Sequence, residues 1–159
     1  NEKARKAGNC PAEVADIISR IRNISGFEEI QEEKIDLSST IYAVKPGDGS
    51  AREQAASCQR VLLGGANITV EYATKRYRSN LINWGMLPFL IKEGELPFAN
   101  GDYLFFPQIR KAVEEKDDVI RGYVVGAEGL KEFEVALGEL TDDEREIILK
   151  GCLINYNRK

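Results

Sequence analysis

Histidine is missing from the 159-residue sequence, and cysteine is scarce. Without histidine, serine–histidine and cysteine–histidine catalytic pairs and every histidine-ligated metal site are excluded. The three cysteines, Cys10, Cys58 and Cys152, are far apart and show no C-x-x-C spacing. They indicate neither a disulfide framework nor a metal site within the chain, and a reducing compartment is expected.

Long apolar runs are missing as well. No stretch approaches the roughly 20 apolar residues that span a bilayer, and the polar start of the chain is unlike a signal peptide. We therefore expect no membrane partner and a cytoplasmic location. The chain begins with Asn1 instead of Met, which suggests a piece excised from a longer protein.

The charge is acidic overall. With 22 basic and 26 acidic residues, the net charge is −4, which disfavours a nucleic-acid partner. A local basic stripe remains possible around Lys75, Arg76 and Arg78. The chain is 43% hydrophobic and 30% charged, so it is expected to fold as a globular domain.

The middle of the chain alternates strand and helix patterns. We predict strands at residues 39–45 and 66–73, helices at 50–62 and 75–84, and a buried extended run at 87–91. This order indicates α/β architecture with at least one parallel crossover.

The remaining elements give weaker signals. Residues 1–10 are expected to be frayed, and a helix begins at Pro11. Further elements are predicted as strands at 103–106, 119–125 and 133–137 and helices at 107–116 and 142–150, the last capped by Thr141. No composition shift marks a boundary, so residues 1–159 are predicted to form one domain.

The turn between the first predicted strand and helix has the chemistry of an anion site. Gly47 and Gly49 permit a tight turn, and Ser50 with Glu53 forms a capping-box pattern, so the helix is predicted to begin at Ser50. A helix start offers unpaired N–H groups, and Arg52 adds a fixed cation. The same residues also occur in ordinary turns and caps, so the motif alone leaves both readings open.

Two segments of the sequence resemble the aconitase superfamily. Residues 47–55 (GDGSAREQA) resemble the Gly-x-Gly-Ser-Ser-Arg-Glu-His-Ala signature of its C-terminal swivelling domain. Residues 63–65 (LGG) and 78–88 (RSNLINWGMLP) resemble its Leu-Gly-Gly and Arg-x-Asn-x-x-Asn-x-Gly-x-Leu-Pro segments, in the same order. The resemblance covers residues 39–91; elsewhere only the order of elements is similar, including the closing segment 151–156.

This resemblance implies a swivelling β/β/α domain with a mixed sheet and flanking helices. It implies a lid over an active site built by other domains, which hold a [4Fe–4S] cluster through three cysteines outside this chain. The chain would then be the C-terminal domain of a hydro-lyase, inactive alone, that acts on a small hydroxy di- or tricarboxylic acid. A separate small subunit, as in isopropylmalate or homoaconitate isomerases, and an RNA-binding regulatory module are the alternatives.

The resemblance assigns roles to individual residues. Ser50 matches the catalytic base, and Arg52 matches the arginine that holds a substrate carboxylate. The family's second serine is Ala51, which retains only its backbone N–H, and the family's histidine is Gln54. The backbone of Gly49 completes the expected substrate contacts.

The second segment is expected to serve structure. Asn80, Asn83 and Gly85 are predicted to secure the end of the helix and the turn before Pro88. Tyr77 and Trp84 are predicted to be core residues, and Arg78 is predicted to be solvated surface.

Overall fold

The computed structural model describes residues 2–126 and 129–158. The chain divides into two compact units, and each is assembled from three separated segments. One unit comprises residues 1–38, 95–107 and 122–133, and the other comprises residues 39–94, 108–121 and 134–159. The segments of the two units alternate along the chain, so no single position in the sequence divides one unit from the other.

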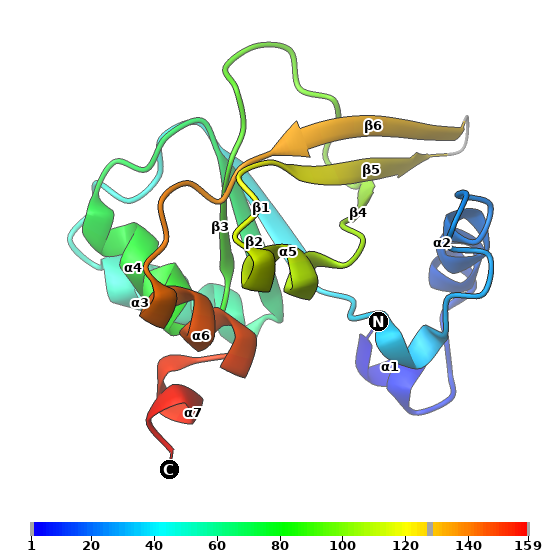
Figure 1. Cartoon of the computed structure of the whole chain (residues 1–159), viewed down its shortest axis with the longest axis horizontal. Helices are drawn as coiled ribbons and strands as arrows, with labels where there is room; N and C mark the ends of the chain where they lie inside the picture. Colours follow the sequence, from blue (N-terminus) through cyan, green and yellow to red (C-terminus); the bar gives the residue numbers. More distant parts are fainter. Residues whose placement is uncertain (1, 127–128, 159) are drawn as a thin grey trace. The chain divides into compact units, whose positions relative to one another are not determined.

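The second unit is built on a parallel sheet. Its strands β1 (Ser39–Ala43), β2 (Gly64–Thr69) and β3 (Leu87–Leu90) lie in that order, and both pairs are parallel (Figure 1). Two helices, α3 (Arg52–Val61) and α4 (Lys75–Asn83), connect successive strands. The predicted α/β class and the predicted parallel crossover are therefore confirmed.

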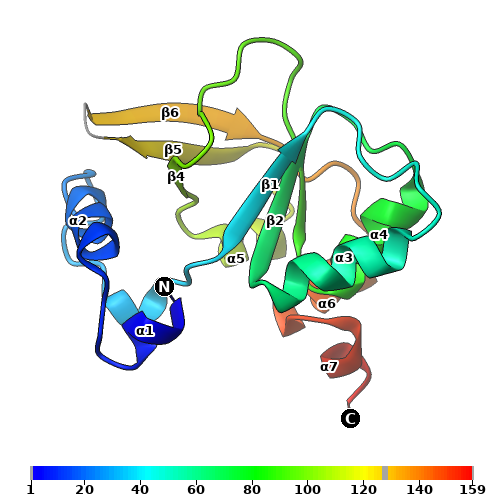
Figure 2. The ribbon, with the colours of Figure 1, turned by 180° about the vertical axis from the view of Figure 1, so that it is seen from behind.

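The two connecting helices pack on each other and against the sheet (Figure 2). Ala56 of α3 is fully buried against Tyr77 and Leu81 of α4 and against Met86. Small residues on α3 permit this close approach, and burying each large side chain contributes about 1.5–3 kcal/mol. The core therefore holds the helix that begins at residue 52 against the helix that follows β2.

The rest of this unit contributes three further helices. It contains α5 (Ile109–Glu115), α6 (Asp142–Lys150) and α7 (Leu153–Asn157), and α6 packs against α4 and α5. The predicted Thr141 cap is confirmed. The Glu144 N–H donates to Thr141 Oγ1 (3.2 Å), and the Thr141 N–H donates to Glu144 Oε2 (2.9 Å).

The antiparallel strands form a sheet of their own. Strands β4 (Tyr103–Phe105), β5 (Ile120–Gly126) and β6 (Gly129–Val135) lie in that order, with β4 antiparallel to β5. The expectation of a single mixed sheet is therefore wrong, because the strands form two separate sheets. Just after β6, Ala136 forms an isolated antiparallel bridge with Leu90, the last residue of β3.

The first unit contains α1 (Glu2–Lys6), α2 (Ala12–Ile21) and the 3₁₀ turn η1 (Glu32–Lys34). The expected fraying of residues 1–10 is therefore wrong for residues 2–6, which form a helix; residue 1 lies outside the described residues. The Arg5 guanidinium binds the Glu2 carboxylate (2.8 and 2.9 Å) and donates to the carbonyl oxygens of Glu32 and Ile35 (2.7 and 2.5 Å). The bond from Arg5 lowers the pKa of Glu2, so the pair stays charged at neutral pH.

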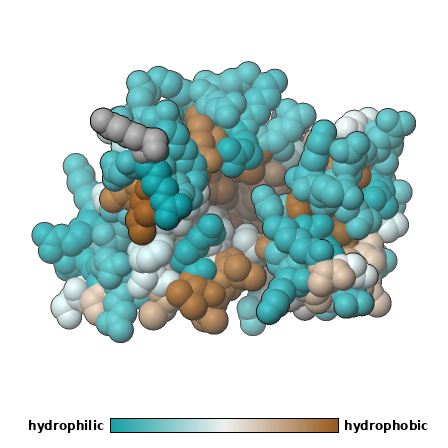
Figure 3. Space-filling model, turned by 90° about the horizontal axis from the view of Figure 1, so that it is seen from below, coloured by the Kyte–Doolittle hydropathy of each residue, from teal (hydrophilic) through white to brown (hydrophobic). Residues whose placement is uncertain are grey.

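Part of the surface is apolar. Figure 3 shows brown, hydrophobic side chains reaching the surface between hydrophilic ones. In the second unit, Val61, Leu62 and Leu63 are 79%, 75% and 52% exposed. No helix within residues 2–126 and 129–158 has the length and apolarity that crossing a bilayer requires.

Candidate functional site

The residues of the predicted anion site lie at the carboxyl edge of the parallel sheet. After β1, the chain is held to the segment that follows β2 by backbone bonds from Glu71 N–H to Val44 O (3.1 Å) and from Ala73 N–H to Pro46 O (2.9 Å). Ligands of open parallel sheets bind at this edge, because the strand-to-helix turns gather there. The turn at residues 44–51 is one of these.

Gly47 fixes the shape of the turn. Its φ is +99°, and a Cβ at this position would lie 2.5 Å from the Cβ of Tyr77, so only glycine fits. Its carbonyl oxygen accepts from Thr74 Oγ1 (2.9 Å) and from Arg52 Nε (3.0 Å). Gly47 therefore ties the start of α3 to the start of α4.

Arg52 is anchored by part of its guanidinium only. Nε donates to Gly47 O and Nη2 donates to Asp48 O (3.3 Å), while Nη1 makes no bond to another described residue. The side chain is half-buried, and these two bonds hold one edge of the guanidinium in place. This arrangement leaves a positioned cation with donors for a carboxylate.

The predicted capping box at Ser50 is wrong. Helix α3 begins at Arg52, its N-cap residue is Ala51 (φ −88°, ψ 45°), and no side chain caps it. The Glu53 carboxylate accepts from Trp84 Nε1 (3.2 Å) instead of from the backbone N–H of Ser50. The exposed Ser50 hydroxyl consequently makes no hydrogen bond within the part of the chain that the structure describes.

An uncapped start leaves backbone donors open. The first helical bond runs from Ala55 N–H to Ala51 O (2.9 Å), so the N–H groups of residues 52–54 have no partner inside the helix. Gly49, Ser50 and Ala51 are exposed immediately before them. The structure thus places all four predicted site residues, Gly49 to Arg52, in one open turn.

Asp48 works against an anion in this turn. Its exposed carboxylate lies beside residues 49–52, and sequence reasoning gave it no role. Its negative charge opposes a bound carboxylate through solvent-screened repulsion. In this turn Arg52 and the helix start therefore favour negative charge, and Asp48 opposes it.

The second sequence segment forms the end of α4. Gly85 has φ +70°, and the bonds from Gly85 N–H to Ile82 O (2.8 Å) and from Met86 N–H to Leu81 O (2.9 Å) form a Schellman motif at the end of α4. A Cβ on Gly85 would lie 1.9 Å from Gly151 O. Gly85 thus secures the helix end as predicted; Asn80 contributes its carbonyl oxygen, which accepts from Trp84 N–H (3.2 Å).

Two other predictions for this segment have different outcomes. Tyr77 is 3% exposed, which confirms it as a core residue. Arg78 is not solvated surface: its guanidinium donates to the carbonyl oxygens of Leu137 (3.1 Å) and Glu139 (2.7 Å). It thus holds α4 to the segment that leads into α6.

Sequence reasoning missed Thr74. Its Oγ1 accepts from Tyr77 N–H (3.2 Å), which caps α4, and its hydroxyl donates to Gly47 O. The available signal was a threonine directly before the first residue of a predicted helix.

Tyr72 lies two residues before Thr74. Burial raises the pKa of its phenol, which stays neutral at physiological pH.

The residues of this chain do not fit an iron–sulfur cluster. Cys58 and Cys152 belong to one unit and Cys10 to the other, and all three are free thiols. Among the described residues, no group of three histidine, cysteine, aspartate or glutamate side chains is placed to hold a metal ion. A cluster would therefore need ligands from elsewhere.

The chain was also compared with known proteins. No protein-family model matches it, and no curated protein matches it significantly.

Proposed function

We propose that this chain is the C-terminal swivel domain of an aconitase-like hydro-lyase, in which Ser50 is the base and Arg52 binds a substrate carboxylate. The observation that carries the proposal is the open start of α3. There an unbonded serine hydroxyl, free backbone N–H groups and an anchored guanidinium lie within one turn. The resemblance of residues 47–55 and 78–88 to the family supports the same assignment.

Ser50 would take a proton from carbon, which requires stabilisation of its alkoxide. The N-terminus of a ten-residue helix supplies partial positive charge, and Arg52 supplies a full one nearby. Both act more strongly once water is excluded from the site. A capped Ser50 would lack this freedom because its oxygen would be committed to the N–H of Glu53.

Arg52 would orient the substrate. Its bonds to Gly47 and Asp48 fix the guanidinium plane, so the unbonded Nη1 meets a carboxylate without losing much side-chain entropy. The backbone N–H groups of Ala51 and Arg52 extend this anion site. The resemblance gives the substrate class as a hydroxy di- or tricarboxylic acid. Ala51 replaces a serine of the family and Gln54 replaces a histidine, so the proposal names no individual substrate.

The cluster belongs to the proposal but not to this chain. In the family it acts as a Lewis acid on the departing hydroxyl. Following the resemblance, we assign the cluster to another domain or to a large subunit. The isolated chain is accordingly expected to be inactive, whether it is a domain or a small subunit.

The test uses the assembly that this chain forms with its cluster-bearing partner. Activity is measured as hydration of unsaturated di- and tricarboxylates, followed by the loss of their ultraviolet absorbance. Ser50→Ala should lower kcat by about 10²–10⁴-fold. Ser57→Ala is the control, because the Ser57 hydroxyl donates to Gln54 O on the same helix (3.1 Å) and should leave kcat unchanged. Equal activity of the two variants would refute the role of Ser50.

A further inference from the structure

One end of the unit that carries the parallel sheet is almost without charge. Residues 39–44 and 54–70, which form β1, most of α3 and β2, contain one charged residue, Arg60, in a chain that is 30% charged. The cores of protein–protein interfaces are depleted of Lys, Glu and Asp and enriched in Arg and in large apolar residues. The composition of this end is therefore closer to that of an interface than to that of a solvated surface.

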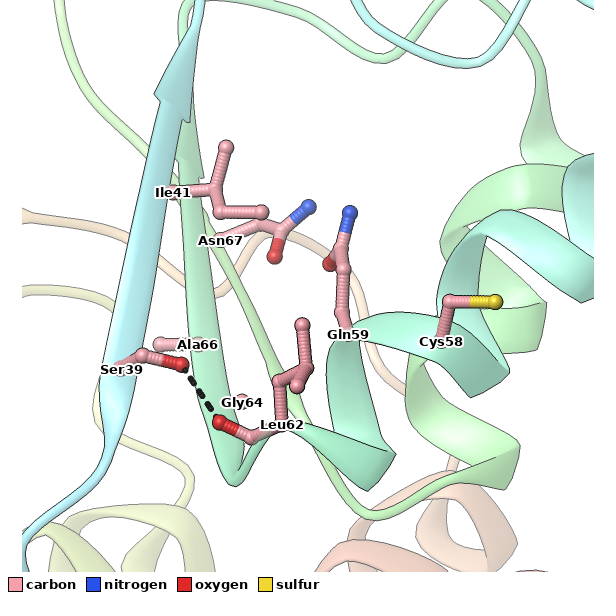
Figure 4. A pocket seen from close by; sticks show the side chains of 8 residues that line it. All are labelled: Ser39, Ile41, Cys58, Gln59, Leu62, Gly64, Ala66 and Asn67. Carbon is pink, nitrogen blue, oxygen red and sulfur yellow. Dashed lines mark hydrogen bonds between the residues drawn. The ribbon is translucent and has the colours of Figure 1, made fainter.

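Exposed apolar side chains gather at the last turn of α3. Val61, Leu62 and Leu63 follow one another there, and all three are more than half exposed. Leu62 and the exposed Ile41 of β1 border the same hollow of about 170 Å³ (Figure 4). At roughly 30 Å³ for each water-sized group, this hollow has room for one aliphatic side chain. These four residues are called the apolar patch below.

Leu63 has a backbone conformation that leucine rarely adopts. Its φ is +62°, in the left-handed region directly after α3, where glycine is the usual residue. A leucine there costs free energy that glycine would avoid, and burial within the chain offsets little of it because the side chain is more than half exposed. A contact outside this chain would account for the leucine.

Arg60 determines which charge fits beside the apolar patch. Its Nη1 donates to the carbonyl oxygen of Gly64, the residue after Leu63 (3.0 Å), and its other nitrogens make no bond to another described residue. Residues 39–44 and 54–70 contain no Asp or Glu that could neutralise it. A partner with a carboxylate next to an apolar side chain is complementary to this arrangement. A second copy of the chain, docked patch to patch, would instead bring two Arg60 cations together.

We propose that the apolar patch binds an amphipathic helix of another protein, which places a leucine-sized side chain in the hollow between Ile41 and Leu62 and a carboxylate at Arg60. Helix α3 has ten residues and rises about 1.5 Å per residue, so the patch lies about 15 Å from Arg52 at the start of the helix. A partner bound here leaves the open start of α3 accessible. The inference therefore does not depend on the proposed function.

The structure favours a helix over an added strand as the occupant. Strand β1 lies at the edge of the parallel sheet, and its register shifts between Ser39 and Thr40. Such an irregularity discourages pairing with a further strand. Binding at this end therefore uses the side chains of the apolar patch, as in the docking of amphipathic helices.

The test is a titration of the full chain with two labelled helical peptides of about four turns, followed by fluorescence anisotropy. Both peptides have the same leucine stripe, and the flanking positions are glutamate in one and lysine in the other. The glutamate peptide should bind saturably and at least about tenfold more tightly. The net charge of −4 attracts the lysine peptide, so non-specific attraction cannot produce this preference. Equal binding, or tighter binding of the lysine peptide, would refute the proposal.

Leu63→Gly separates a role in binding from a role in folding. It removes the exposed side chain and relaxes the backbone at a positive φ. It should therefore weaken binding of the glutamate peptide at least about tenfold without lowering the urea midpoint of unfolding. Leu130→Ser, at an exposed position on β6, is the control and should leave the peptide affinity unchanged. A lower midpoint with unchanged binding would show that Leu63 serves the fold alone.

Arg60→Gln tests the carboxylate contact. It should weaken binding of the glutamate peptide about tenfold and remove its advantage over the lysine peptide. An advantage that persists in this variant would overturn the role of Arg60. Sedimentation of the chain alone tests the second copy: a dimer that Leu63→Gly dissociates would overturn the proposed occupant. These readouts do not involve Ser50, so the inference and the proposed function can fail separately.

Discussion

Two helices of this protein begin with the same sequence pattern and different structures. Residues 50–53 and 141–144 are both Ser or Thr followed three positions later by Glu. At α6 the pattern forms a complete capping box, whereas at α3 neither half of the box forms. The comparison shows that the pattern predicts a cap only where the flanking backbone and the glutamate are free to make it.

Tertiary contacts explain why α3 remains uncapped. Gly47 and Arg52 shape the turn so that Ala51, not Ser50, is the N-cap residue. Trp84 engages Glu53 from α4. The side-chain cap that binds the Glu144 N–H in α6 therefore has no counterpart at α3, where the N–H groups stay open beside a cation.

The largest expected effect on stability comes from disrupting the Gly47 turn, which precedes α3 and has no counterpart before α6. Gly47→Ala forces a Cβ into Tyr77 at a positive φ and should reduce the free energy of unfolding by about 2–4 kcal/mol. Gly49→Ala is the matched control, because no atom lies within 4 Å of its added Cβ, and it should change stability by less than about 0.5 kcal/mol. Urea unfolding followed by circular dichroism measures both. Equal losses would show that the turn does not depend on Gly47.

The next effect concerns binding at the open start. Arg52→Gln should weaken the binding of a carboxylate such as citrate about tenfold, equivalent to about 1.4 kcal/mol, because it removes the cation that is anchored beside the open helix start. Trp84, the single tryptophan, contacts Glu53 and should report binding through its fluorescence. Arg76→Gln, an exposed change on α4, should leave the affinity unaltered. An unchanged affinity in Arg52→Gln would remove Arg52 from the site.

A third pair of variants compares the caps themselves. Thr141→Ala should cost about 1 kcal/mol of unfolding free energy, since it breaks a cap that exists. Ser50→Ala should change stability by less than about 0.5 kcal/mol, since it removes an exposed, unbonded hydroxyl. Thermal or urea unfolding measures the difference. A loss near 1 kcal/mol for Ser50→Ala would mean that Ser50 caps α3 after all.

The smallest expected effect tests the repulsive charge. Asp48→Asn should tighten citrate binding by about two- to threefold, because it removes an exposed carboxylate from the turn. Asp117→Asn, at an exposed position outside the turn, is the control. The gain should shrink as salt is added, and a gain that is independent of salt would point to a change in structure instead.

Much of the fold follows from local signals. Thr74 and Gly85 bracket α4, and Thr141 and Gly151 bracket α6, so these helices were predictable almost to the residue. The strands of the parallel sheet were predictable from their apolar runs and the glycines between them. These signals act over a few residues, where the sequence pattern decides the structure.

The remainder depends on residues far apart in the sequence. Nothing near Glu53 indicates that Trp84 will take its carboxylate, and nothing near Arg78 indicates two carbonyl acceptors about 60 positions later. The order within helix α1 likewise rests on Arg5 reaching Glu32 and Ile35. The position of residues 49–52 in one strand-to-helix turn was therefore predictable, but the uncapped state of Ser50 was not.

The most direct test is a titration of the chain with citrate, followed by its backbone ¹H–¹⁵N signals. The account predicts saturable shifts at residues 52–54, where the helix start is open, and none at residues 142–144, where the Thr141 hydroxyl occupies the Glu144 N–H and three carboxylates repel an anion. Equal shifts at both helix starts, or none at residues 52–54, would contradict it.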